Sequence, residues 1–321
     1  MSTAVKSAPV FISGHARSGT TLLGNLIDRH PSFAIFLESF FIPRYAVTQR
    51  LYSPLHKREN LEALARSITS QRSSIDNGLQ FTPDLLDILP EPTYPHLIDA
   101  MMSNWAKNQS KKRWGDKSPG YITKFSVLKE LFPNAKFVHI IRDGRDVCLS
   151  LQALGWESNP VRVAKAWSKT VGGASLYGRQ NLGDDYLEIN YERLIADPAN
   201  ELETIMGFLG ESFFESQLSN QPVVSNNNAF APWPGVNQSV KASNAEKWRS
   251  AMPPKDLQLF NLVAGDALRQ LGYPVESTST LRLRAEAAVR GAIGDVETGI
   301  RKSREASSVL VREARLRTRR R

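Results

Sequence analysis

The sequence predicts an α/β fold, a three-layer sandwich built on a central, mainly parallel sheet with a P-loop after its first strand. Short apolar runs alternate with segments of helical spacing, the order typical of parallel sheets covered on both faces. A glycine-bounded loop joins the first apolar run to the first helical segment. Beyond residue 275 the composition becomes basic. We therefore predict a folded domain at residues 1–275 and a basic tail at 276–321, helical at first and then disordered.

Four apolar runs are the strand candidates. Residues 136–141 form the clearest one, since they are apolar and β-branched, and residues 10–13 and 187–190 form shorter ones. A fourth run, residues 35–37, is followed at once by Glu38.

Helical spacing fills most of the sequence between these runs. The region 44–109 is mostly helical and interrupted by prolines, so we expect it to cover the sheet or to form a lid over a pocket. Two further helices are predicted from Val161 to about Gly178 and from Pro254 to Leu271. Residues 215–240 are rich in Asn, Ser, Pro and Gln, which indicates a long loop or a mobile lid.

Composition excludes several classes of protein. With 41% hydrophobic residues the chain can bury a core, so it is not expected to be disordered. Its only cysteine, Cys148, excludes an internal disulfide and fits a reducing compartment. Residues 1–9 lack the apolar stretch of a secretory signal, and no run approaches the roughly 20 apolar residues of a membrane span. We expect a cytoplasmic protein, with peripheral attachment to the inner membrane face as an option.

The net charge of +9 is concentrated in the tail. Residues 281–321 hold eleven arginines and one lysine against five acidic residues, a net of +7, which leaves +2 for the rest. Apolar residues recur there at helical intervals up to Ile300, and an Arg-rich end follows at 315–321. The tail could be a solvated helix, contact a second subunit, or bind an anionic partner. Among these partners an anionic membrane surface is preferred and nucleic acid is not expected.

The loop between the first strand and helix has the spacing of a phosphate-binding loop. It runs from Gly14 to Thr21 and matches G-x-x-x-x-G-x-[ST]. Backbone N–H groups in such a turn, together with the helix N-terminus, can hold a phosphate. An ordinary glycine-containing turn is the alternative interpretation.

One position in this loop departs from the nucleoside-triphosphate pattern. Such loops carry lysine directly after the second glycine, to reach the β- and γ-phosphates. Here Thr20 takes that position, and the cation of the loop is Arg17. The clearest strand candidate ends in Arg142 rather than in an aspartate that could hold Mg²⁺. The loop therefore indicates a nucleotide other than ATP–Mg²⁺, and no metal requirement is expected.

At this point the chain resembles the PAPS-dependent sulfotransferase family, most closely its tyrosylprotein and carbohydrate branches, as a bacterial-type member. Residues 17–21 resemble the family's 5′-phosphosulfate loop, and residues 142–150 resemble its 3′-phosphate motif. Residues 114–119 are similar to its Gly-Glu-Lys-Thr-Pro motif. The likeness extends from about Val10 to Leu271, with the three motifs in the family's order.

This resemblance implies transfer of a sulfuryl group from 3′-phosphoadenosine 5′-phosphosulfate (PAPS) to an acceptor hydroxyl of a sugar, lipid headgroup, phenol or tyrosine. Glu38 takes the position of the tyrosylprotein branch's base. The implied catalytic residues are Glu38, Arg17 and Lys117, and the implied donor-binding residues are Arg17, Ser18, Gly19, Thr20, Thr21, Arg142, Ser150, Tyr191 and Lys247.

Elementary chemistry agrees with these assignments. Sulfuryl transfer needs positioning and charge stabilisation more than covalent help, and Arg17 with Lys117 would counter the developing negative charge. The acceptor needs a base, for which Glu38 is preferred over His30, a residue that precedes Pro31 and suits a capping role. A buried strand position is expected for His139.

Two other functions are compatible with the sequence. A P-loop kinase or another NTP-dependent transferase would require ATP–Mg²⁺, against which Thr20 argues. A non-catalytic nucleotide-binding domain tethered by its basic tail would not depend on Glu38 or Lys117.

Overall fold

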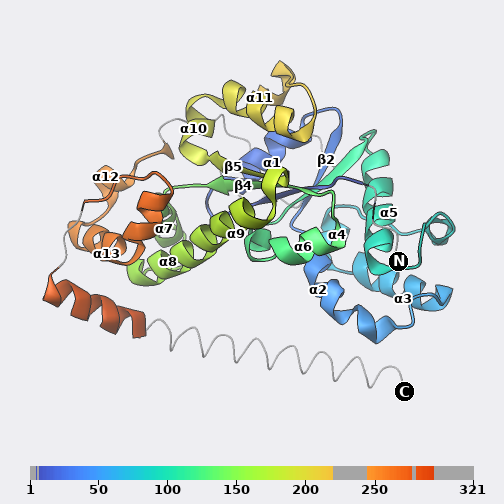
Figure 1. Ribbon diagram of the computed structural model, residues 1–321, viewed down its shortest axis with the longest axis horizontal. Helices are drawn as coiled ribbons and strands as arrows, with labels where there is room; N and C mark the ends of the chain where they lie inside the picture. Colours follow the sequence, from blue (N-terminus) through green and yellow to red (C-terminus); the bar gives the residue numbers. More distant parts are fainter. Residues whose placement is uncertain (1–4, 6, 220–243, 277–279, 293–321) are drawn as a thin grey trace. The chain divides into compact units, whose positions relative to one another are not determined.

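The computed structural model describes residues 5, 7–219, 244–276 and 280–292 of the chain (Figure 1). The chain forms two compact units. The sheet unit comprises residues up to 142 together with 170–246, and the helical unit comprises 143–169 together with the residues from 247 on. Most of the predicted lid at 215–240 and the predicted Arg-rich end at 315–321 lie outside the described residues. The boundary at residue 275 stays a prediction.

Five parallel strands form the sheet, in the order β2-β3-β1-β4-β5. Val10 of the central strand pairs with Gly115 on one side and with Lys136 on the other. The predicted α/β architecture with a parallel sheet is therefore confirmed. The strands are β1 (Val10–Ser13), β2 (Phe33–Leu37), β3 (Arg113–Lys117), β4 (Lys136–Ile141) and β5 (Tyr186–Asn190).

Strand β3 was not among the expected strands, because its sequence Arg-Trp-Gly-Asp-Lys is short and polar. It forms a strand nevertheless, because it lies between β1 and β2 and its backbone pairs with both. Gly115 is required at this crossing. A Cβ at Gly115 would lie 2.7 Å from the backbone oxygen of Val10. Trp114 is buried and donates from its indole nitrogen to Asp99 at 2.8 Å.

One face of the sheet is covered by α1 (Thr20–Asp28), α10 (Tyr191–Ala196) and α11 (Pro198–Leu209) (Figure 1). Alternate strand residues point to this face and make an aliphatic core with the helices. Its fully buried members include Val10, Ile12, Leu23, Ile27, Val138, Ile140, Leu194, Leu202, Ile205 and Met206.

Aromatic side chains fill the opposite face of the sheet, beneath α5 (Tyr94–Lys107), α6 (Phe125–Leu131) and α9 (Gly173–Asn181). Phe11 of β1 is at the centre, with ring centroids 5.9 Å from Trp114 and 5.6 Å from Phe137. Such offset and edge-on contacts add to the energy of burial. The region 44–109 forms α2 (Phe41–Thr48), α3 (Arg58–Thr69) and α4 (Arg72–Asp76) before α5.

The chain order places the carboxyl ends of the strands next to one another at one edge of the sheet. From β1 the chain continues through α1 to the edge strand β2, whereas β3 and β4 lie on opposite sides of β1. The strand order therefore reverses beside β1. Open parallel sheets bind ligands at such a reversal, outside the carboxyl ends of the strands.

The helical unit contains α7 (Gly144–Ala153), α8 (Pro160–Trp167), α12 (Trp248–Ala251), α13 (Pro254–Gln270) and a further helix at 281–292. Asp143 begins α7, accepting from the backbone and the guanidinium of Arg145, which stacks 3.6 Å from the centre of the Trp248 ring. Cys148 of α7 is buried, and burial raises the pKa of its thiol to about 12.

Of the two long helices expected from the sequence, one is present and the other is interrupted. The expected helix 254–271 corresponds to α13. The expected helix 161–178 is interrupted, because the π-helical turn Ser168–Gly172 separates α8 from α9. Within the described ranges, no helix has the length and apolar character needed to cross a membrane.

The close contact between α9 and β5 generates a testable prediction. A Cβ added at Gly178 would lie 2.3 Å from the ring of Tyr186, whereas one added at Gly173 of the same helix would meet nothing within 4 Å. Gly178→Ala should therefore lower the free energy of unfolding by about 1–3 kcal/mol, while Gly173→Ala should leave it unchanged or slightly higher. Urea unfolding followed by circular dichroism measures both. Equal stabilities would contradict the packing described for α9.

Candidate active site

The loop after β1 has the tight geometry of an anion-binding turn. The Ser18 N–H donates to the His15 carbonyl at 3.1 Å, and Arg17 and Gly19 have φ values of 70° and 88°. Thr20 and Thr21 then begin α1. This helix has no side-chain cap and no acidic residue in its first turn. Its N-terminal N–H groups are consequently available to an anion.

Two glycines in this loop are required by close contacts. A Cβ at Gly14 would lie 2.5 Å from the carbonyl oxygen of Ile140. One at Gly19 would lie 2.4 Å from the Tyr191 ring, in a backbone conformation that L-residues rarely adopt. The first glycine thus lets the loop approach β4, and the second lets it approach the start of α10.

Ser18 supplies an observation that points to a ligand. Its hydroxyl oxygen is buried and, among the described residues, meets no hydrogen-bonding partner. Buried hydroxyls are normally satisfied, and leaving one without a partner costs stability. The site fits an oxyanion, because a phosphate or sulfate oxygen would accept from this hydroxyl and from the adjacent backbone N–H groups.

Arg142 connects the end of β4 to the loop. It donates to the Arg17 carbonyl at 3.0 Å and to the Asn244 carbonyl at 2.8 Å, and its guanidinium lies 4.6 Å from the centre of the Tyr191 ring. Burial, and then the charge of Arg142, lower the pKa of Arg17. The sheet unit thus holds two nearby arginines whose mutual repulsion a bound anion would relieve.

Lys117 and Glu38 form an ion pair at the ends of β3 and β2. The lysine Nζ lies 2.7 Å from Glu38 Oε1; the lysine side chain is fully buried, and that of the glutamate is 35% exposed. Burial lowers the pKa of Lys117, and the Glu38 carboxylate opposes this effect. The aliphatic stem of Lys117 passes α1 at Gly24, where a Cβ would be 3.1 Å from the lysine Cγ. The pair thus consists of one partly exposed carboxylate and one shielded cation.

The backbone around Glu38 is held in an uncommon conformation. Glu38 has a φ of 58°, and its N–H donates to the Lys117 carbonyl at 2.9 Å. The next residue, Ser39, is fixed by its hydroxyl contact with Tyr121 at 2.5 Å and by Ser73, which donates to its carbonyl at 2.9 Å. Such strain persists only where the surroundings impose it, and it is concentrated at functional sites.

Asp116 completes this support. It accepts from the Ser39 N–H at 3.3 Å and from the Ser118 hydroxyl. Complete burial raises its pKa to about 6. The supporting residues Ser39, Ser73, Asp116 and Tyr121 were not anticipated from the sequence. Only Asp116 and Ser118 gave a signal, as polar residues at the end of a strand within the motif at 114–119.

A cavity of about 360 Å³ opens beside Glu38. Asn77 closes its edge by bonding both backbone groups of Leu37, its side-chain oxygen accepting from the N–H at 2.9 Å and its amide donating to the carbonyl at 2.9 Å. The lining mixes apolar, neutral polar and charged side chains. It consists of Leu37, Glu38, Ser39, Phe40, Phe41, Arg44, Gln71, Arg72, Ser73, Asp76 and Asn77.

His30, the alternative base, and His139, the expected buried strand residue, both have structural contacts. His30 accepts from Ser32 N–H at 3.0 Å, and its other ring nitrogen contacts the Ser212 carbonyl at 3.1 Å, so both nitrogens are used. His139 is fully buried against the Tyr186 hydroxyl at 2.6 Å, and burial lowers its pKa to about 4. The identity of the general base stays a prediction.

Two residues implied as donor contacts, Ser150 and Lys247, belong to the helical unit, as does Trp248. Ser150 is half-buried on α7, Lys247 is exposed at the start of α12, and Trp248 is buried under Arg145. The roles of Ser150 and Lys247 towards a donor stay predictions. Seven other predicted site residues lie in the sheet unit, at the carboxyl ends of the strands: Arg17, Ser18, Gly19, Glu38, Lys117, Arg142 and Tyr191. In the described part of the chain, no group of His, Cys, Asp and Glu is arranged to hold a metal.

Comparison with known proteins shows the family of this chain. A family model described as "Sulfotransferase family" matches residues 9–215, which is more than half of the chain. The chain belongs to the sulfotransferase family. The prediction made from the three motifs is confirmed, and the enzyme is a sulfotransferase.

Similar proteins and structures agree with the family. Protein-tyrosine sulfotransferase 1 of Danio rerio is 24% identical over 277 residues, covering 82% of this chain and 72% of the relative. Protein-tyrosine sulfotransferase 2 of Gallus gallus is 26% identical, with 82% and 69% covered. The sulfotransferase domain from the curacin biosynthetic pathway has a TM-score of 0.56 at 20% identity, covering 85% of this chain and all of that one. This structural likeness shows the shared fold.

The Lys117–Glu38 pair generates a prediction about ionisation. Because the Glu38 carboxylate raises the pKa of Lys117 against the effect of burial, Glu38→Gln should lower that pKa further. A titration of the Lys117 Cε resonance by NMR would measure the shift. Asp76→Asn, which changes another cavity carboxylate, should leave it in place. An identical Lys117 titration in wild type and Glu38→Gln would show that the pair does not form in solution.

Proposed function

We propose that this sulfotransferase uses PAPS as donor and transfers its sulfuryl group to an acceptor hydroxyl by in-line displacement, with Glu38 as general base. The observation that supports this most is the 2.7 Å pair of Glu38 and Lys117 at the strand ends that also bear the anion-binding loop. A base and a cation are thereby held together where acceptor and donor would meet.

The donor would be held through its two phosphate-bearing positions. The loop amides from Ser18 to Thr21, the Ser18 hydroxyl and Arg17 suit the 5′-phosphosulfate, since they combine N–H donors with a positive charge. Arg142 suits the 3′-phosphate, and Tyr191 offers an aromatic ring beside it. Donor contacts by Ser150, from the motif at 142–150, and by Lys247, from the wider family resemblance, stay predictions.

In the proposed reaction the acceptor oxygen forms a bond to sulfur while the bond from sulfur to the 5′-phosphate oxygen breaks. The acceptor proton goes to Glu38, and adenosine 3′,5′-bisphosphate leaves with the bond's electron pair. Lys117 and Arg17 stabilise the negative charge on the sulfuryl and departing oxygens. No metal is part of this proposal, because these side chains supply the positive charge.

The acceptor would enter through the cavity beside Glu38. Its volume of about 360 Å³ suits a single sugar or aromatic ring bearing the hydroxyl. The named relatives are protein-tyrosine sulfotransferases, which supports a hydroxyl acceptor in general. Sugar, lipid headgroup, phenol and tyrosine all stay within the proposal. We also propose a cytoplasmic location, because a single buried cysteine is typical of proteins in a reducing compartment.

The donor site can be tested by calorimetry with adenosine 3′,5′-bisphosphate in metal-free buffer. Wild type should bind it, and Arg142→Ala should bind about 10–100-fold more weakly, because a charge-assisted hydrogen-bonding group is lost. Lys124→Ala, a change at an exposed lysine, should match wild type. No binding of the bisphosphate together with clear binding of ATP–Mg²⁺ would replace the donor by a nucleoside triphosphate and favour a kinase-like function.

Catalysis can be tested by turnover with labelled PAPS. Glu38→Gln should lower kcat by about 10²–10⁴-fold, the usual contribution of a general base, while bisphosphate binding is retained. Asp76→Asn, on the wall of the same cavity, should lower kcat much less. Unchanged turnover in Glu38→Gln would remove Glu38 as the base, whereas absence of turnover in wild type would favour a non-catalytic nucleotide-binding role.

The dependence of kcat on pH can distinguish the ionisation of Lys117 from that of the general base. Since burial lowers the pKa of Lys117, its charge and the activity should be lost as pH rises through that lowered pKa. Lys117→Arg keeps its charge at every relevant pH, so its activity, though reduced, should not fall on the alkaline side. The measurement is kcat against pH for both proteins. An alkaline fall at the same pH in Lys117→Arg would assign that titration to another group.

A further inference from the structure

The helix at 281–292 is a defined element of the helical unit. It begins after Thr280, whose side-chain oxygen accepts from the Leu283 N–H at 3.2 Å and whose carbonyl accepts from the Arg284 N–H at 3.1 Å. Threonine is a favoured residue for this capping position. The first part of the basic tail is thus folded, and its two faces can be examined separately.

The inner face of this helix is apolar and packs on α8 and α13. Leu283 and Ala287, one turn apart, are buried in a cluster with Val161 and Leu259. Gly291 continues the same face one turn later, where a Cβ would lie 2.6 Å from Lys165 Nζ. Small side chains therefore let the helix lie close to α8.

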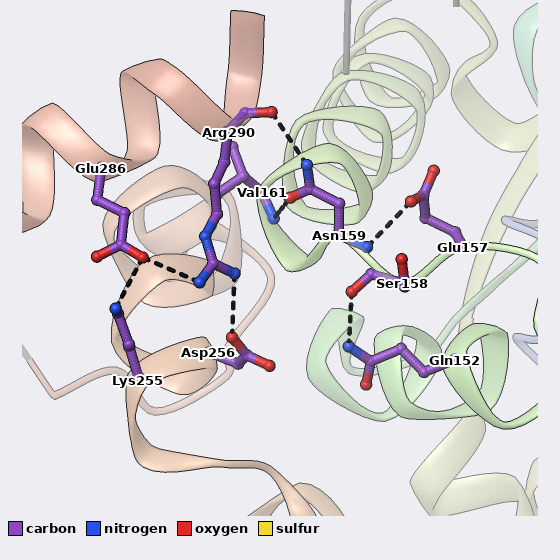
Figure 2. Close-up of polar contacts among 9 residues, drawn as sticks. All are labelled: Gln152, Glu157, Ser158, Asn159, Val161, Lys255, Asp256, Glu286 and Arg290. Atoms are coloured by element: carbon purple, nitrogen blue, oxygen red, sulfur yellow. Dashed lines mark hydrogen bonds and ion pairs between the residues drawn. The ribbon is translucent and has the colours of Figure 1, made fainter. Parts of the chain in front are cut away.

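Polar contacts fix the rotation of the helix about its axis (Figure 2). The carbonyl of Arg290 accepts from Asn159 Nδ2 at 3.0 Å, and its guanidinium lies 2.9 Å from Glu286 and 3.4 Å from Asp256. Glu286 in turn pairs with Lys255 at 2.9 Å. These contacts tie the helix to Lys255 and Asp256 of α13 and to Asn159 at the start of α8. They therefore determine which face of the helix is exposed.

That outer face is a second apolar stripe. Leu281 is 87% exposed and Val289 is 60% exposed. At about 3.6 residues per turn, these two residues lie with the exposed alanines 285, 288 and 292 on the side opposite Leu283 and Ala287. By the same spacing the exposed Arg282 and Arg284 stand on the two borders of the stripe. The helix therefore has an apolar stripe on its outer face as well as on the face that packs against α8 and α13.

We propose that this outer face binds an anionic lipid surface and attaches the enzyme peripherally to a membrane. The inference goes beyond sulfotransfer and does not depend on it. An apolar stripe bordered by arginines matches the boundary between acyl chains and headgroups, with Leu281 and Val289 inserted and the guanidinium groups at the lipid phosphates. The net charge of +7 in residues 281–321 complements such a surface.

Two other partners fit this face less well. A nucleic acid would contact the arginines but would leave the apolar stripe exposed to water, because its outer surface is a row of phosphates. A second copy of the chain, docked through a two-fold axis, would bring two faces of the same positive charge together. An anionic bilayer satisfies the apolar stripe and the arginines at once.

The test is flotation of the full-length protein with lipid vesicles. Wild type should float with vesicles of phosphatidylcholine and phosphatidylglycerol and not with phosphatidylcholine alone, and added salt should weaken the binding. Arg282→Glu/Arg284→Glu should bind at least about 25-fold more weakly, at about fivefold per arginine. Leu281→Ser/Val289→Ser should lose binding while its thermal unfolding stays at the wild-type temperature, because both side chains are exposed.

A matched control separates this helix from net charge. Arg50→Glu/Lys57→Glu makes the same change in total charge at two exposed residues of the sheet unit and should float like wild type. The proposal is overturned if wild type does not float with anionic vesicles, or if the control loses binding as fully as Arg282→Glu/Arg284→Glu. Normal flotation of Leu281→Ser/Val289→Ser would also overturn it. So would a wild-type dimer in sedimentation, or wild-type binding to a DNA duplex, that this variant abolishes.

Discussion

Burial of one ammonium group sets the requirements for much of the sheet unit. Lys117 ends a central strand with its side chain fully shielded, and an unpaired buried charge of this kind would cost several kcal/mol. Glu38 offsets that cost from the neighbouring strand end. To reach the lysine it takes a left-handed backbone conformation, which Ser39, Tyr121, Ser73 and Asp116 hold in turn. One charge therefore accounts for the left-handed residue, the polar support behind it and the wall of the cavity.

The loop after β1 gathers positive charge beside the end of β4. Arg17 lies near Arg142, and the Ser18 hydroxyl is buried without a protein partner in the described part of the chain. A buried hydroxyl without a partner and two neighbouring positive charges each cost stability, and an oxyanion bound at this loop would offset both costs. In the proposed reaction the loop serves the donor's charge, and the Lys117–Glu38 pair serves the acceptor's proton.

Sequence reasoning found the parts of this site that depend on local pattern. The runs at β1, β4 and β5 are apolar enough to be recognised alone, and the loop and Glu38 follow directly from the ends of such runs. Strand β3 was missed because pairing on both edges, rather than its own composition, makes it a strand. The contacts of Tyr121 and Ser73 with Ser39 join residues 34 to 82 positions apart, and no local pattern records them.

The buried thiol of α7 has a practical consequence. Cys148 is the only cysteine of the chain, and a group that stays protonated up to about pH 12 reacts slowly with maleimides and disulfides, which require the thiolate. A cysteine introduced at any exposed position would therefore be the single reactive thiol. The native chain can serve directly as the background for site-specific fluorescent or spin labels, without first replacing a residue in its core.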